Sequence, residues 1–269
     1  MNILIPTCIV GVMGVVFGIA LAFASKAFSV SPDPRIGKIR DALPGANCAA
    51  CGYTGCDAYA AAVVEDGVAA NLCAVGGQGV AEAIGAVLGI DAGVVEVKTA
   101  RVKCSGTAEA CGAKCEYSGI TECAAAKLVQ EGQNACGYGC LGFGDCARAC
   151  KFGAIYIQDG IARVIASRCT ACGKCAAACP KKLIEVVPAH INYIVLCANK
   201  DRGAVTRKNC TAGCIGCMRC TTVCSVKAIT VQNNLASIDP AKCRRCGECV
   251  KVCPQKCIHY YDCTLRRAV

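Results

Sequence analysis

The chain opens with an apolar run that no charged residue interrupts from Ile3 to Ser25. About 20 apolar residues in an α-helix cross the hydrocarbon core of a bilayer, so this run predicts a transmembrane helix within residues 1–27. Basic residues follow the run, beginning with Lys26 and Arg35, and none precedes it. The positive-inside rule then predicts a single-pass protein of the cell inner (cytoplasmic) membrane, with its N-terminus outside and the remaining chain in the cytoplasm.

A cleaved signal peptide is the alternative interpretation, because Ala22-Phe23-Ala24 resembles a cleavage site. The basic start of a signal peptide is missing, and export would expose the many thiols of the chain to an oxidising compartment, so an uncleaved anchor is favoured. The sequence SPDP at residues 31–34 predicts that the helix has ended and that residues 28–40 form a linker.

Beyond the linker, the patterns are short and predict an α+β protein. Residues 57–66 and 79–88 are typical of two short helices. The segments AIYIQDGIARV and AITVQNNLASI each predict a β-hairpin, with Asp159-Gly160 and Asn233-Asn234 at the turns. The stretches ARVKC and INYIVLC are strand-like and end in Cys104 and Cys197.

The two predicted hairpins belong to an internal repeat, in which residues 136–180 align with residues 210–254. Each copy consists of a cysteine run, the hairpin and a second cysteine run closed by proline. The second runs are CTACGKCAAACP and CRRCGECVKVCP, with cysteines at equal spacing. We therefore expect two tandem units of the same fold.

Composition explains what holds such small units together. The 269 residues include 29 cysteines, no tryptophan and only 5% aromatic residues, so a large apolar core is not expected. Disulfides are one alternative, but four cysteines within eleven residues present their sulfurs to a common point and not to each other. The pattern favours metal-cluster cages.

The spacing C-x₂-C-x₂-C-x₃-C-P is typical of bacterial ferredoxins with two [4Fe–4S] clusters. Three thiolates of such a run bind one cluster, and the fourth binds the neighbouring cluster of the pair. Each unit should therefore hold two clusters that exchange a ligand. The spacing predicts three ligand sets, which are Cys214, Cys217, Cys220 and Cys253; Cys243, Cys246, Cys249 and Cys224; and Cys169, Cys172, Cys175 and Cys150.

The remaining cluster of the first unit departs from this pattern because Phe143 stands where the second unit has Cys217. We expect Cys136 to substitute, so that the set is Cys136, Cys140, Cys146 and Cys179. A site with three cysteines or a lost cluster is the alternative.

Two further groups lie outside the repeat. Cys48, Cys51, Cys56 and Cys73 form a complete four-cysteine site, for which zinc is the alternative to an iron–sulfur cluster. An additional cluster could use Cys104, Cys123, Cys197 and Cys210, for which buried or free thiols are the alternative. The spacing assigns no role to Cys8, Cys111, Cys115, Cys257 or Cys263. The total is five [4Fe–4S] clusters, or six with the additional site.

The formal net charge of +10 would suggest a nucleic-acid partner if the thiols stayed neutral. A [4Fe–4S] cluster with its four thiolates adds about −2, so five clusters cancel this excess. The basic side chains therefore balance the cofactors, and we expect no nucleic-acid partner. Pairs such as Lys181-Lys182 are expected to be solvated surface charges.

The order of apolar anchor, NCAACGYTGC with Cys73, GCLGFGDC, GCIGC and two CP-closed runs resembles the RnfB family in its long form with two ferredoxin-like units. RnfB proteins are the electron-input subunits of Rnf complexes. The resemblance covers nearly the whole chain. It implies the domain order 1–27 anchor, 28–40 linker, 41–100 iron–sulfur module, 101–135 connector, 136–195 first unit and 196–269 second unit.

The resemblance further implies a subunit of an ion-translocating ferredoxin:NAD⁺ oxidoreductase. This subunit would accept electrons from soluble reduced ferredoxin and relay them toward NAD⁺ reduction on other Rnf subunits, with no complete NAD site of its own. A membrane-tethered polyferredoxin that serves another oxidoreductase, such as a hydrogenase, is the alternative function. A zinc-rich binding or structural protein is a second alternative, and it would be colourless.

Overall fold

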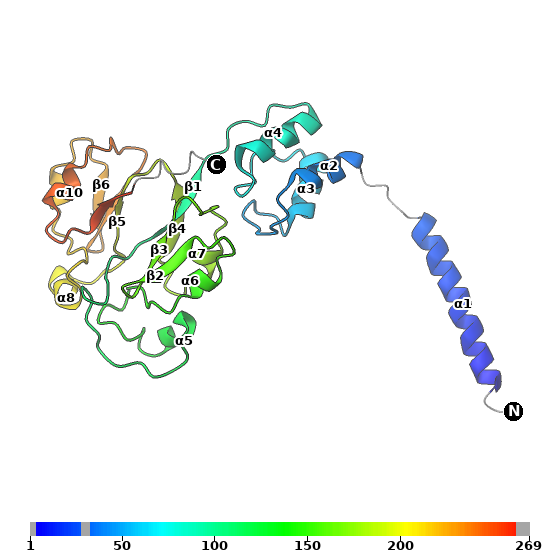
Figure 1. Cartoon of the computed structure of the whole chain (residues 1–269), viewed down its shortest axis with the longest axis horizontal. Coiled ribbons are helices and arrows are strands. Elements are labelled where there is room, and N and C mark those ends of the chain that lie inside the picture. The colour runs from blue at the N-terminus through cyan, green and yellow to red at the C-terminus, as the bar shows by residue number, and fades with distance from the viewer. Residues whose placement is uncertain (1–3, 28–32, 262–269) are drawn as a thin grey trace.

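The computed structural model describes residues 4–27 and 33–261, which form an isolated helix, a helical module and two cysteine-rich α+β units (Figure 1). The helices are α1 (Leu4–Ala27), α2 (Pro34–Ala42), α3 (Cys56–Glu65), α4 (Gly77–Leu88), α5 (Cys123–Leu128), α6 (Asp145–Arg148), α7 (Lys174–Ala178), α8 (Gly203–Asn209), α9 (Arg219–Thr222) and α10 (Glu248–Val252). The strands are β1 (Lys98–Val102), β2 (Ile155–Gln158), β3 (Ile161–Val164), β4 (Ile184–Pro188), β5 (Tyr193–Val195), β6 (Ile229–Gln232), β7 (Leu235–Ile238) and β8 (Ile258–Tyr260).

Helix α1 stands apart from the other elements (Figure 1). Its 24 residues extend about 36 Å at the usual rise of an α-helix. The window Ile9–Lys26 has a mean hydropathy of 2.0, and its large apolar side chains are exposed, with Phe23 at 75%. This helix is long and apolar enough to cross a membrane, as the sequence predicts.

Helix α2 corrects the predicted linker over residues 28–40. Asp33 caps this helix by accepting a 2.8 Å hydrogen bond from the backbone N–H of Arg35, and Pro34 occupies the first helical position. An aspartate N-cap followed by proline is a helix start signal, so the SPDP motif begins a helix at its second proline. Ile39 of α2 is fully buried in a core with Tyr59 of α3 and Ile84 of α4.

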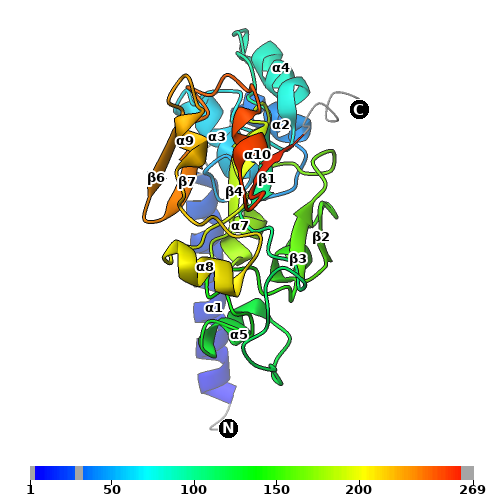
Figure 2. The same ribbon diagram turned by 90° about the vertical axis from the view of Figure 1, so that its left-hand side faces the viewer.

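The two hairpins form as predicted. Strand β2 pairs with β3, and β6 pairs with β7, both antiparallel. Asp159-Gly160 and Asn233-Asn234 adopt positive φ at both turn positions, the geometry of tight hairpin turns. Figure 2 shows the hairpins on opposite sides of the molecule, with β1 and β4 between them. In each unit the hairpin turn lies against the cysteine loop, where a Cβ on Gly142 would stand 2.5 Å from the Gly160 carbonyl oxygen.

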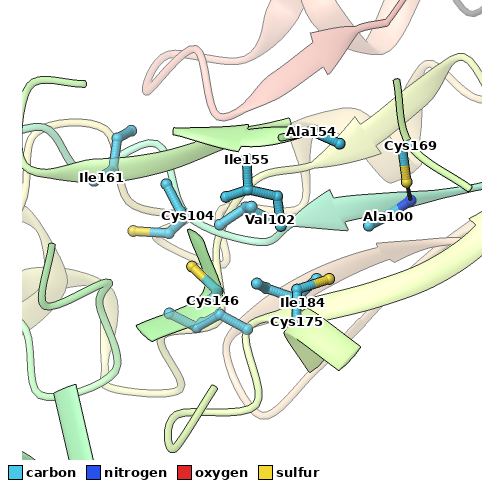
Figure 3. Packing of buried hydrophobic residues seen from close by; sticks show 12 residues of the cluster. Ala100, Val102, Cys104, Cys146, Ala154, Ile155, Ile161, Cys169, Cys175 and Ile184 are labelled. Carbon is cyan, nitrogen blue, oxygen red and sulfur yellow. Dashed lines mark hydrogen bonds between the residues drawn. The ribbon is translucent and has the colours of Figure 1, made fainter. Parts of the chain in front are cut away.

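Each unit contains a second two-stranded sheet, and one strand of each sheet lies outside the predicted bounds of its unit. Strand β1 pairs with β4, and β5 pairs with β8. The predicted boundaries at residues 136 and 196 would separate β1 and β5 from these partners. Both strands are strand-like in the sequence, but only the tertiary structure shows which unit each one joins. Each core is built from cysteines and small or branched apolar residues, as Figure 3 shows for the first unit.

Candidate iron–sulfur sites

All described cysteines except Cys115 gather in six groups. Within the described ranges, no three cysteine, histidine or acidic side chains converge closely enough to hold a single metal ion. In three of the groups the thiols instead line a cavity. The thiolates of a [4Fe–4S] cluster bind separate irons at the corners of a cube, so thiols spaced around a central space fit such a cluster better than a tetrahedral zinc site.

The first group lies in the helical module and consists of Cys48, Cys51, Cys56 and Cys73, as grouped by the sequence. The Asn47 side chain accepts a 2.8 Å hydrogen bond from the Cys56 backbone N–H, which fixes the loop at the start of α3. The Gly76 N–H donates to the Cys73 sulfur at 3.4 Å. Burial raises the pKa of Cys73, so a positively charged partner is needed to hold this thiol as a thiolate.

In each unit, the first three cysteines of the CP-closed run lie with one cysteine of the preceding run. We call this the outer group of the unit and the other group of thiols its inner group. Both outer groups have the members that the sequence predicts. Cys169, Cys172 and Cys175 lie with Cys150, and Cys243, Cys246 and Cys249 lie with Cys224. The backbone at the start of each hairpin is hydrogen-bonded to the cysteine that comes from the preceding run. The Ala154 N–H donates to the Cys150 sulfur at 3.4 Å, and the Ala228 N–H donates to the Cys224 sulfur at 3.2 Å. The N–H of Ala100 in β1 donates to the Cys169 sulfur at 3.3 Å (Figure 3).

The inner group of the first unit differs from the sequence-based grouping. Its cavity is lined by Cys140, Cys146 and Cys179 as expected, but the fourth thiol is Cys123 and not Cys136. Burial, and then the neighbouring Cys140, raises the pKa of Cys146 to about 12.

Cys123 reaches this cavity because α5 is held against α6. The Asp145 carboxylate accepts hydrogen bonds from the backbone N–H groups of Cys123 and Ala124, at 3.0 and 3.1 Å. Phe143, which stands where the second unit has a cysteine, packs against the Tyr117 ring at 5.5 Å between centroids. The segment before α5 therefore covers Phe143, and Cys123 at the start of α5 supplies the thiol that the loop lacks.

A connector group lies between the units and contains five thiols, Cys104, Cys111, Cys136, Cys197 and Cys210. The additional site predicted from the sequence shares Cys104, Cys197 and Cys210 with this group. Its fourth predicted member was Cys123, whereas the structure has Cys136 there. Buried Asn199 donates from its side chain to Cys136 and from its backbone to Cys197, both at 3.4 Å.

Two of the connector thiols face each other across an isolated β-bridge, Cys111 and Cys210. A hydrogen bond from Cys210 lowers the pKa of Cys111 to about 6, while Cys210 keeps its proton. Burial raises the pKa of Cys104 to about 12. The group is thus rich in sulfur and shielded from water, with one thiol disposed to ionise.

The inner group of the second unit contains its four predicted cysteines, Cys214, Cys217, Cys220 and Cys253, together with Cys257. Cys257 is 2% exposed, and its sulfur lies 3.6 Å from that of Cys253. Hydrogen bonds with Cys214 and Cys253 raise the pKa of Cys257, which favours the protonated thiol at this position. In the first unit Leu183 lines the cavity at the equivalent position. Sequence reasoning missed this fifth thiol because it lies outside the repeated runs.

Among the described residues, one cysteine and both histidines remain outside these groups. Cys115 is exposed and lines none of the three cavities. Neither histidine belongs to a group, and burial lowers the pKa of His259. Cys263 and the Cys8 side chain lie outside the description of the structure.

Hydrogen bonds join the inner group of each unit to the connector group. The Cys140 N–H of the inner group of the first unit donates to Cys104 of the connector at 3.4 Å. The Cys214 N–H of the second unit bonds to Cys197 of the connector. An apolar N-terminal helix and successive groups of four or five thiols in ferredoxin-like units define a membrane-associated, multi-centre electron-transfer protein of the iron–sulfur class.

Comparison with known proteins agrees with this class. Family models match an Fe-S cluster family at residues 43–75, a 4Fe-4S binding domain at residues 162–185 and a 4Fe-4S dicluster domain at residues 213–264. The B subunit of the Na(+)-translocating ferredoxin:NAD(+) oxidoreductase complex of Acetobacterium woodii is 47% identical, over 95% of this chain and 77% of the relative.

Two further relatives cover most of both chains. The B subunit of the ion-translocating oxidoreductase complex of Methanosarcina acetivorans is 41% identical over 91% of this chain and 94% of its own. Its counterpart in the proton-translocating ferredoxin:NAD(+) oxidoreductase complex of Clostridium ljungdahlii is 39% identical over 90% and 87%. The chain belongs to the RnfB family of ion-translocating oxidoreductase complexes, and its role is electron transfer through iron–sulfur clusters. This confirms the resemblance seen in the sequence.

Proposed function

We propose that this chain accepts electrons from reduced ferredoxin and relays them through six [4Fe–4S] clusters toward NAD⁺ reduction on partner subunits. The observation that carries this proposal is the connector group. It contacts the inner group of each unit, so that five of the six thiol groups form one continuous series. The clusters supply one-electron redox centres, while the protein sets their order and surroundings. The names of the relatives support ferredoxin and NAD⁺ as the two redox partners.

The proposed ligand sets follow the groups seen in the structure. Five sets contain four thiols each, and the connector set takes its fourth thiolate from the Cys111–Cys210 pair. They are Cys48, Cys51, Cys56 and Cys73; Cys150, Cys169, Cys172 and Cys175; Cys123, Cys140, Cys146 and Cys179; Cys214, Cys217, Cys220 and Cys253; Cys224, Cys243, Cys246 and Cys249; and Cys104, Cys136 and Cys197 with Cys111 or Cys210.

The proposed topology places α1 across the membrane with the N-terminus outside. Lys26 follows the apolar run, and every described cluster-binding group lies on the C-terminal side of α1. The thiols are then held in the reducing cytoplasm, where a soluble donor has access to them.

Iron and acid-labile sulfide in the anaerobically purified full-length protein test the cofactor proposal. We expect brown protein with about 24 irons per chain, four for each cluster. Mixing with reduced ferredoxin should reduce the clusters and change the visible absorbance. Stoichiometric zinc with little iron contradicts the proposal, and partners that copurify distinguish the complex from a hydrogenase-linked polyferredoxin.

Replacing Cys257 tests whether its thiol tunes the inner cluster of the second unit. Hydrogen bonds to ligand thiolates stabilise the extra negative charge of a reduced cluster. We expect Cys257→Leu to lower the reduction potential of this cluster by on the order of tens of millivolts, with iron content unchanged. The first unit provides the matched control, because Leu183→Cys should raise the potential of its inner cluster. EPR-monitored redox titration measures both, and an unchanged potential in Cys257→Leu refutes the role.

A further inference from the structure

A basic groove of about 770 Å³ opens between the two ferredoxin-like units. Its charged lining consists of Lys103, Lys127, Lys181, Lys182 and Lys200 against Glu131 and Asp201. Lysines outnumber acidic residues here, so the side chains that line the groove carry a net positive charge, although the chain as a whole becomes nearly neutral or slightly acidic once its clusters are counted.

Two of the lysines are available to a partner. Lys103 pairs with Glu185, Lys181 pairs with Glu131, and the Lys127 ammonium donates to the Pro180 carbonyl oxygen at 3.0 Å. Lys182 and Lys200, by contrast, are exposed and form no ion pair within the described part of the chain. Their charges remain directed at solvent and at whatever occupies the groove.

The groove lies directly over the electron-transfer groups. Lys103, Tyr138 and Ala198 line both the groove and the connector cavity. Pro180 and Lys181 line both the groove and the inner cavity of the first unit. A protein seated here would therefore be separated from two cluster-binding groups by single layers of residues. Tyr138, 38% exposed, adds an aromatic contact of the kind that anchors protein interfaces.

We propose that this groove is the docking surface for the electron donor, a small acidic iron–sulfur protein, and this rests on the proposed function. Each thiolate-bound cluster in the donor carries negative charge, and a reduced cluster carries one more than an oxidised cluster. The lysines therefore bind the reduced donor more tightly than the oxidised donor, so the affinity for the donor falls after electron transfer. One electron passes from the donor, which is oxidised, to this chain, which is reduced, and no covalent bond forms or breaks.

Charge reversal in the groove tests the proposal against a matched control. Lys182→Glu/Lys200→Glu and Lys38→Glu/Lys208→Glu change the total charge equally, but Lys38 and Lys208 are exposed residues outside the groove. Full-length anaerobic protein is mixed with reduced 2[4Fe–4S] ferredoxin in stopped flow at several salt concentrations. We expect the groove variant to lower the second-order rate of reduction at low salt by about tenfold or more. The control variant should stay within about twofold of the wild type.

The readouts separate docking from function. Iron content and the response to dithionite must match the wild type in both variants, so that a lower rate reflects encounter and not cluster loss. Equal rates for the groove and control variants, in a wild type that ferredoxin does reduce, overturn the docking surface and leave the proposed function standing. A wild type that dithionite reduces but ferredoxin does not overturns the proposed function itself. Loss of the salt dependence in the groove variant alone supports the surface.

Discussion

Cys123→Ala should remove the inner cluster of the first unit, whereas Cys136→Ala should leave that cluster in place. The reason is the position of α5, whose first residue completes the cavity of Cys140, Cys146 and Cys179. We expect each variant to lose about four irons per chain, but from different centres. Cys136→Ala should lose the connector cluster, because its sulfur lies with Cys104 and Cys197. Iron and sulfide analysis with EPR of the remaining centres measures the difference.

Cys115→Ala is the matched control for both substitutions. This cysteine is exposed and belongs to no group, so its removal should leave iron content and every EPR signal unchanged. Loss of the inner cluster in Cys136→Ala, with retention in Cys123→Ala, would restore the assignment based on the sequence. The Cys136 variant should also slow electron passage between the two units, because the connector group joins them.

Cys224→Ala should damage the cluster of the distant run, Cys243, Cys246 and Cys249, more than the cluster of Cys214, Cys217 and Cys220. Cys224 follows the nearer run in sequence but lies with the distant one in space. Removing one thiolate leaves an iron open to water, which should shift its potential and make the cluster labile. We expect a loss of up to about four irons and of one EPR centre.

The hairpin of β6 and β7 should persist in this variant, because its strands pair independently of the Cys224 side chain. Cys150→Ala in the first unit is the parallel experiment and should affect the cluster of Cys169, Cys172 and Cys175. If either substitution removes only the cluster nearest in sequence, the exchange of ligands proposed for both units is disproved.

The sequence alone was sufficient for the groups whose geometry is local. In each CP-closed run, three cysteines within seven residues are gathered by a loop and one turn of helix, so spacing dictates which sulfurs meet. The hairpins were equally predictable, because the residue pairs at their turns favour the positive φ that the turn requires. The apolar run of α1 and the repeat itself likewise needed no tertiary information.

The tertiary structure decided the contacts between segments that are distant along the chain. Cys123 replaced Cys136 in the first unit because Asp145 accepts two backbone hydrogen bonds from the start of α5, and Tyr117 packs on Phe143. No spacing rule encodes such a contact, since its energy comes from packing and hydrogen bonds that exist only in the folded chain.

The same holds for the connector group and for the groove. Cys104, Cys136 and Cys197 come from three separate segments, and Lys182 and Lys200 flank one groove only because the two units pack side by side. The sequence determined the class of this protein, its apolar N-terminal helix, its repeat and the thiol groups that local spacing gathers, because these depend on neighbouring residues. The joining of the thiol groups of the two units into one series depends on long-range packing, and therefore only the folded structure could decide it.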